Sequence, residues 1–294
     1  MTIGPAEVFD LGYRPYEGGR TSRWRRRGAI WRDGVRISLG LGRGAGAKVA
    51  PWLLIALALV PVAVLIVIAS FAASLGGDAD EIELPSYAEY YDFAIVPIGL
   101  FAAIVAPLLL CPDRRDGVLS LYGARPITPA DYVAARWAAF LTVATAAALL
   151  PEAILFAWNA LDAPSTGSFL RDNWDVVPRF AASGAIVALV FTTLSLLLAS
   201  FTTRRAHAAV ATLAVMFVGS AVAGIAEDNF SGAVADSLTL AGLPGVVTDT
   251  VDWIFGEDLS GRPLSAGIRA LWLAGLTTAL GVGLLRRTDR IVRA

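Results

Sequence analysis

The side chains that could do chemistry in this 294-residue chain are few, and many of them share one stretch. The segment CPDRRDGVLSLYGARPITPADYVAARW (residues 111–137) carries four arginines, three aspartates and three prolines between two apolar runs. Fixed charges beside apolar residues are typical of a surface that docks another protein. The alternative is a connector that only caps the two helices that it joins.

Residues for other kinds of chemistry are scarce. The chain has one histidine, His207, and one cysteine, Cys111, so it contains no HExxH motif and no Cys/His cluster for zinc. The nearest approach to a phosphate-binding loop, GLGRGAGAKVA (40–50), lacks the Gly-Lys pair of that motif. We therefore expect no enzyme activity, no catalytic residue, no metal, no cofactor and no nucleic-acid partner for this chain. Because the chain has no phosphate-binding loop, any ATPase that acts together with it must be a separate protein.

The composition predicts a membrane protein, because 56% of the residues are hydrophobic and only 17% are charged. A hydrocarbon core of ~30 Å needs about 20 apolar residues of helix. Six runs fit: residues 52–75, 93–111, 133–158, 180–203, 208–226 and 264–285. The expected fold is an all-α integral membrane protein with six transmembrane helices. A cytoplasmic lead (1–50) precedes the transmembrane domain (51–294), and loop 112–132 joins the second and third spans.

The charges predict the orientation of the spans, because lysine and arginine are retained on the cytoplasmic side. Residues 1–50, the 111–136 loop, the 203–206 turn and the tail after residue 285 hold twenty of the twenty-four basic residues. The other three loops hold sixteen of the twenty-five acids. Both termini are therefore expected in the cytoplasm, and the segment between the last two spans is expected outside, as short helices or as a loosely packed loop.

The segment before the first span has the pattern of an amphipathic helix. From residue 23 to 39, a helix would place Trp24 and Trp31 in one stripe and Arg25 and Arg32 on its flank. Tryptophan favours the membrane interface and arginine favours anionic headgroups. We expect an in-plane elbow helix on the membrane, and the alternative is a merely basic tail that directs insertion.

Within the 111–137 segment, turn and capping residues predict two helices. Pro112 suits the first turn of a short helix, where Asp113 and Asp116 would face the positive end of the helix dipole. Thr128, followed by Pro129 and then Asp131 in capping-box position, predicts the start of a second helix that runs into the third span.

Glu152 is an acidic residue inside the predicted 133–158 span, directly after Pro151. Burial of a carboxyl group in a membrane is costly and usually has a function, so Glu152 is a weak candidate for contact with a transported cargo. The alternative is a carboxylate that reaches the outer interface.

These features together resemble the membrane subunits of type-2 ATP-binding-cassette (ABC) exporters. The loop sequence DRRDGVLSLYGARPIT is similar to the family pattern D/E-R-x-x-G-x-L-x-x-L followed by an R-P-I/V-[ST] turn and a helix. The family is also known for six spans, cytoplasmic termini and an elbow helix. The resemblance implies that the loop is a coupling helix seated on an ATPase. The coupling residues would be Asp113, Arg114, Arg115, Asp116, Gly117, Leu121, Arg125 and Pro126.

For function, the resemblance implies a permease subunit in a bacterial plasma membrane. A separate ATPase would bind ATP and Mg²⁺, and a second permease copy or a paralogue would complete the complex. The cargo would be amphipathic or lipid-like, moved out of the cell or between leaflets. A different interpretation also fits the loop, namely a non-transporting scaffold or sensor subunit that holds a cytoplasmic partner.

Overall fold

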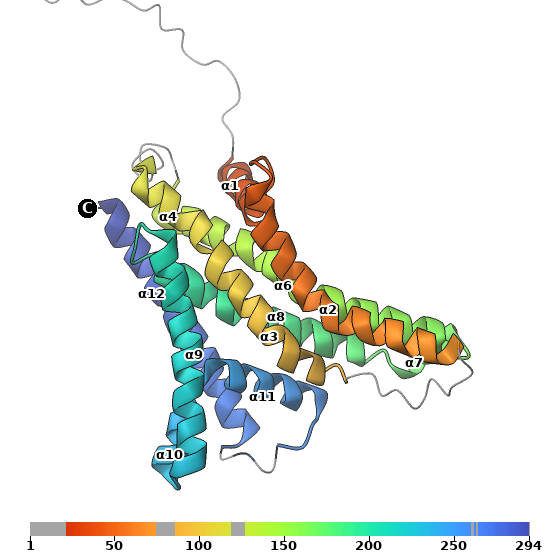
Figure 1. Ribbon diagram of the computed structural model, residues 1–294. Helices are drawn as coiled ribbons and strands as arrows, with labels where there is room; N and C mark the ends of the chain where they lie inside the picture. The colour runs from red at the N-terminus through yellow and green to blue at the C-terminus, as the bar shows by residue number, and fades with distance from the viewer. Residues whose placement is uncertain (1–21, 75–85, 119–126, 260–261, 263, 294) are drawn as a thin grey trace, which may run out of the picture.

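The computed structural model describes residues 22–74, 86–118, 127–259, 262 and 264–293 (Figure 1). In this part of the chain every regular element is a helix. The predicted lead before residue 22 and three predicted coupling residues lie outside the described residues. Those three are Leu121, Arg125 and Pro126.

Six of the described helices, or pairs of consecutive helices, are long and apolar enough to cross a membrane, at the positions of the six predicted runs. The chain is thus an all-helical, multi-pass membrane protein. The spanning elements are α2 (Gly46–Ser74), α3 (Glu89–Val105) with α4 (Pro107–Arg115), α6 (Pro129–Asp162), α8 (Val176–Ala199), α9 (Arg205–Asn229) and α12 (Ala266–Arg293). The other helices are α1 (Arg23–Ser38), α7 (Thr166–Asp172), α10 (Ala233–Thr239) and α11 (Leu243–Phe255).

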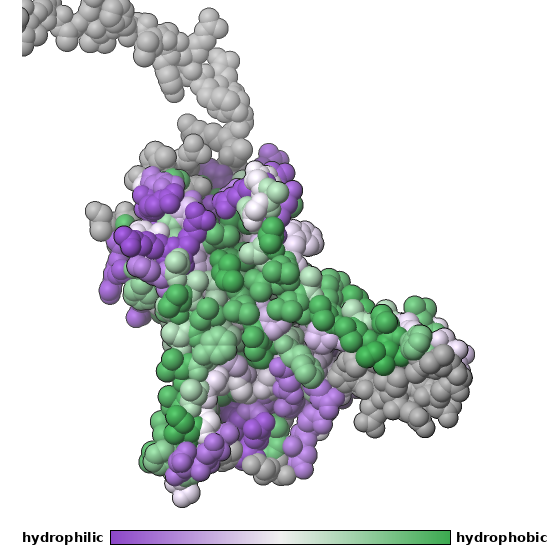
Figure 2. All heavy atoms as spheres, in the orientation of Figure 1, coloured by the Kyte–Doolittle hydropathy of each residue, from purple (hydrophilic) through white to green (hydrophobic). Residues whose placement is uncertain are grey.

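The centre of the bundle is α3, in which eleven of seventeen residues are buried against α2, α8, α9 and α6. Stacked Phe101 and Phe140, whose ring centroids are 5.4 Å apart, join α3 to α6. In contrast, α2 and α9 expose large apolar side chains such as Phe71 and Phe217. Figure 2 shows hydrophobic residues across the middle of the molecule and hydrophilic residues at the end formed by α1 and α4. This distribution suits a helix bundle whose solvent is lipid.

The helix start at residue 129 was predicted correctly. Thr128 accepts a hydrogen bond from the backbone N–H of Asp131, and the Asp131 side chain accepts one from the backbone N–H of Thr128. Pro151 lies inside α6 and does not end it. The segment between the last two spans also forms two helices, α10 and α11, as predicted.

The prediction for Pro112 was wrong. The structure places Pro112 inside the last turns of α4, so Asp113 lies near the end of a helix and not in the first turn of a new one. A proline inside a helix removes one backbone hydrogen bond, and membrane-spanning helices commonly tolerate this loss. The second span accordingly continues past Pro112 as far as Arg115. Gly117 follows the C-cap residue Asp116 of this helix, and its φ of +67° favours glycine.

The N-terminal helix α1 runs alongside the first turns of α6. Its contact face contains Ile30, Gly34 and Ser38, which are buried, whereas Trp24 and Trp31 of the predicted stripe remain exposed. The two helices approach so closely that a Cβ on Gly34 would lie 2.6 Å from the Cβ of Ala139. Only glycine allows this contact without a shift of one helix.

This contact predicts opposite effects for alanine at two glycines of the same helix. Gly34→Ala should lower stability by about 1–3 kcal/mol through overpacking against α6. Gly28→Ala should be neutral or slightly stabilising, because a Cβ there meets nothing within 4 Å and alanine favours helix. Thermal midpoints of the purified variants in one detergent test this, and equal midpoints would contradict the close approach.

Candidate functional site

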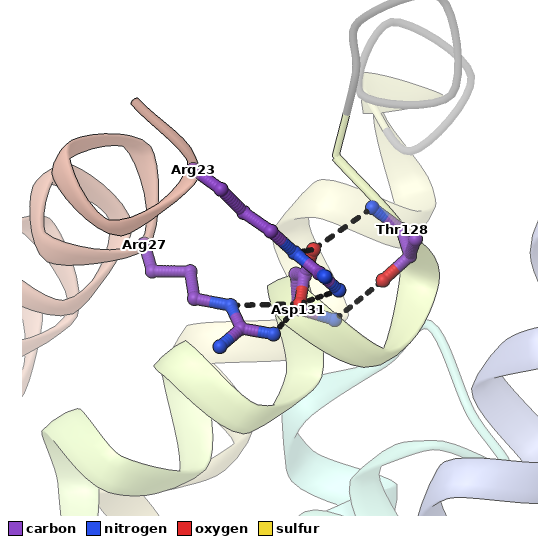
Figure 3. A network of polar contacts seen from close by, with 4 residues as sticks. All are labelled: Arg23, Arg27, Thr128 and Asp131. Atoms are coloured by element: carbon purple, nitrogen blue, oxygen red, sulfur yellow. Dashed lines mark hydrogen bonds and ion pairs between the residues drawn. The ribbon is translucent and has the colours of Figure 1, made fainter. Parts of the chain in front are cut away.

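The two ends of the 112–132 loop are held by a network of ion pairs and hydrogen bonds around two buried charges, Asp131 and Arg136. Its first part is Asp131, whose side chain is only 1% exposed and lies between two arginines of α1 (Figure 3). Arg23 donates from Nε to Oδ2 at 2.8 Å and from Nη2 to Oδ1 at 2.9 Å. Arg27 donates from Nε to Oδ1 at 2.7 Å and also from Nη2. One carboxylate thus caps its own helix and binds α1 to it.

The second part of the network centres on Arg136, one helical turn further along α6. Its side chain is 3% exposed and bridges two acids, with Nη1 2.7 Å from Asp33 of α1 and Nη2 2.9 Å from Asp113 of α4. The Tyr132 hydroxyl donates to the same Asp113 oxygen at 2.6 Å. The two acids compensate the buried guanidinium, and removal of either one would leave its charge poorly compensated.

The third part joins α4 to the end of α8. Nη1 of Arg114 donates to the backbone carbonyls of Ala199 (3.4 Å), Ser200 (2.6 Å) and Thr202 (2.9 Å). These carbonyls belong to the C-terminal end of α8 and the turn after it, where the helix dipole favours a cation. Cys111, one turn earlier, is buried against the same carbonyl groups. The end of α4 is therefore fixed to the α8–α9 turn.

The structure divides the described coupling residues into two groups. Asp113 and Arg114 turn into the bundle and bind α6 and α8, as above. Arg115, Asp116 and Gly117 are exposed. The Arg115 and Asp116 side chains form a surface ion pair at 2.8 Å, and this hydrogen bond lowers the pKa of the Asp116 carboxyl. Among the coupling residues that the structure describes, these three are the ones at the protein surface.

Sequence reasoning identified Asp131 as a capping residue and missed its two arginine partners. It also missed Arg136, although a charge just inside the predicted 133–158 span was a usable signal. The residues predicted for an elbow helix all lie on exposed parts of α1, namely Trp24, Trp31, Arg25 and Arg32. The Trp31 indole donates to the Thr142 hydroxyl at 3.3 Å and so also touches α6.

A second candidate site lies in the part of the bundle where α6, α3 and α8 meet. Glu152 is fully buried, and within the described part of the chain neither carboxylate oxygen has a hydrogen-bond partner. The Tyr91 hydroxyl and Ser183 Oγ are likewise buried without a partner there. The Glu152 side chain therefore does not reach the protein surface, and its burial is unusually costly.

Near the other end of the bundle, Asp249 of α11 is paired with Arg269 at the start of α12, and both side chains are 3% exposed. Nε of Arg262 lies 3.1 Å from the same carboxylate. Among the described residues, no group of three or more His, Cys, Asp or Glu could hold a metal ion. No protein-family model matches the sequence, and no curated protein matches it.

The unpartnered carboxyl group predicts a gain in stability when it is removed. Glu152→Leu should raise the free energy of unfolding by about 1–3 kcal/mol, because an unsatisfied buried polar group is replaced by an apolar one. Glu152→Gln should gain less, since its amide is still polar. Thermal midpoints of the two variants measure this. A loss of stability in the leucine variant would mean that the carboxyl group has a strong partner.

A pH-dependent stability is expected from Asp252 of α11. Burial, helped by the nearby carboxylate of Asp92, raises the pKa of Asp252 to about 6. The folded pKa is then above the unfolded value of about 3.9, so this residue costs stability as the pH rises from about 4 to about 6.

Asp252→Asn should remove that cost. Its thermal midpoint should equal that of the wild type below about pH 4 and exceed it above about pH 7. The corresponding gain in the free energy of unfolding is about 1 kcal/mol after allowance for solvent screening. The midpoints of both proteins across this range provide the test. A constant difference at every pH would show that the effect does not arise from titration of Asp252.

Proposed function

We propose that this chain is the permease subunit of a type-2 ATP-binding-cassette exporter in a bacterial plasma membrane. The observation that carries the proposal is the charge network at the base of loop 112–132. Arg114 binds the end of α8, Asp113 binds Arg136 of α6, and Asp131 binds α1. A force applied to the loop would therefore reach three other helices directly, which is what a coupling loop requires.

In this proposal the chain transmits the movement of an ATPase to the transmembrane helices and does not itself hydrolyse ATP. A separate ATPase binds ATP and Mg²⁺ and docks on the loop through its exposed residues, Arg115, Asp116 and Gly117, together with Leu121 and Arg125. Closure of the ATPases on nucleotide then moves α4 and the start of α6. Because buried ion pairs are costly to break, the network favours movement of the helix ends as one unit.

The proposed topology places both termini in the cytoplasm and α1 at the inner membrane surface as the elbow helix. The basic loops support this orientation. The exposed Trp24 and Trp31 support an interfacial position for α1. The acidic segment that contains α10 and α11 is then outside.

A second copy of the chain, or a paralogue, would complete the exporter. The exposed apolar faces of α2 and α9 are available for this contact. The cargo is proposed to be amphipathic or lipid-like, and Glu152 is the residue proposed to contact it. A buried carboxyl group without a partner supports this role, because selection for stability alone would remove it.

The test is ATP hydrolysis by the complex purified from its own host membranes and reconstituted in lipid. We compare the wild type with the charge swap Arg115→Glu, Asp116→Arg, which alters only exposed residues of the loop. We expect the co-purified ATPase either to dissociate or to lose at least tenfold of its permease-dependent turnover. A suitable control is the swap Asp175→Arg, Arg179→Glu, which reverses another exposed arginine–aspartate pair, on α8 and its N-cap.

The control swap should leave turnover unchanged. If no ATPase co-purifies with the wild type, or if hydrolysis is indifferent to the loop swap, the exporter proposal fails. A partner without ATPase activity that is released by the loop swap would instead favour a scaffold or sensor subunit.

A further inference from the structure

An open cleft of about 360 Å³ lies between α1 and α6. Its α6 wall consists of three alanines, Ala134, Ala135 and Ala138. Its α1 wall consists of Trp24, Arg27, Gly28 and Trp31. The volume is within the range of small-molecule sites, and the lining is apolar apart from one guanidinium. We propose that this cleft binds an anionic phospholipid, with an acyl chain between the helices and the phosphate at the arginines of α1.

The shape of the cleft results from small residues on both helices. The three α6 residues present only methyl groups, and a Cβ added to Gly28 would meet nothing within 4 Å. The exposed Trp24 and Trp31 rings border this space. Tryptophan at such a position is favoured where headgroups meet acyl chains. An apolar cleft beside a membrane surface is filled by an acyl chain more favourably than by water.

The charge around the cleft selects an anionic headgroup. Two arginines, Arg23 and Arg27, share the single carboxylate of Asp131, so this cluster carries an excess positive charge (Figure 3). The two hydrogen bonds from Arg27 to Asp131 use two of its five N–H donors. Helix α1 as a whole has six arginines and one aspartate. Guanidinium groups bind phosphate in a bidentate manner and prefer it to a zwitterionic headgroup.

A lipid at this place would act on the base of the loop. Arg27 both lines the cleft and binds Asp131, so a phosphate held by Arg27 would extend the charge network by one anion. The excess positive charge would be neutralised, and α1 would be held more firmly on α6. This inference does not depend on the identity of the cytoplasmic partner.

Tryptophan fluorescence provides the test, because Trp24 and Trp31 border the cleft. The full-length protein is reconstituted in phosphatidylcholine vesicles that contain increasing fractions of phosphatidylglycerol with brominated acyl chains, which quench nearby tryptophans. Brominated phosphatidylcholine serves as the comparison. We expect a saturable quenching component that reaches half its maximum at a roughly fivefold lower fraction of the anionic lipid, the factor for one arginine near a charged headgroup.

Two variants fill the cleft from opposite sides, Gly28→Leu on α1 and Ala138→Leu on α6. Both should abolish the saturable component. The control is Gly275→Leu, the same change on α12 at another glycine with nothing within 4 Å of its Cβ, and it should retain the component. Because either cleft variant suffices, the test stands even if one of them does not fold.

Two outcomes would overturn the proposal. Equal half-saturation by the two brominated lipids would mean that the tryptophans meet only the general lipid surface. A saturable component that persists in a folded cleft variant would place the lipid elsewhere. Neither measurement involves ATP hydrolysis, so a failure of the exporter proposal would not affect the result.

Discussion

The buried guanidinium of Arg136 is the constraint around which the loop end of the molecule is arranged. A charge at 3% exposure beside apolar spans is stable only with several acceptors, and these come from Asp33 of α1 and Asp113 of α4. Once the two acids are fixed there, α1, α4 and α6 cannot separate without leaving a charge unpaired. Asp131 with its two arginines adds a second link between α6 and α1. Arg114, which binds the carbonyls at the end of α8, ties α4 to that helix as well.

Two of the ionisable residues of α6, Arg136 and Glu152, have opposite surroundings. Arg136 has partners on two other helices, whereas Glu152, about four turns further along, has none among the described residues. The first arrangement is what a rigid junction requires. The unpartnered carboxyl group of Glu152 lowers the stability of a packed region. Proteins commonly keep such a group only where a ligand or a proton stabilises it.

The spans could be predicted from the sequence because each is a local property, a run of about 20 apolar residues. The start of α6 was predictable for the same reason, since Thr128 and Asp131 are three residues apart. Their arginine partners are more than a hundred residues away, and no local pattern indicates such a pairing. Pro112 was misjudged because its local helix-start preference was overridden by the continuation of the second span.

The long separation between Arg23 and Asp131 also bears on how the protein is made. The two residues are 108 positions apart, so α1 leaves the ribosome well before the helix that it will bind. At synthesis rates of about 5–20 residues per second, α1 waits roughly 5–20 seconds for its partner. During that interval the six arginines of α1 lack the carboxylate that Asp131 supplies in the folded protein. Assembly of the junction is thus a late step, completed only when the third span has been inserted.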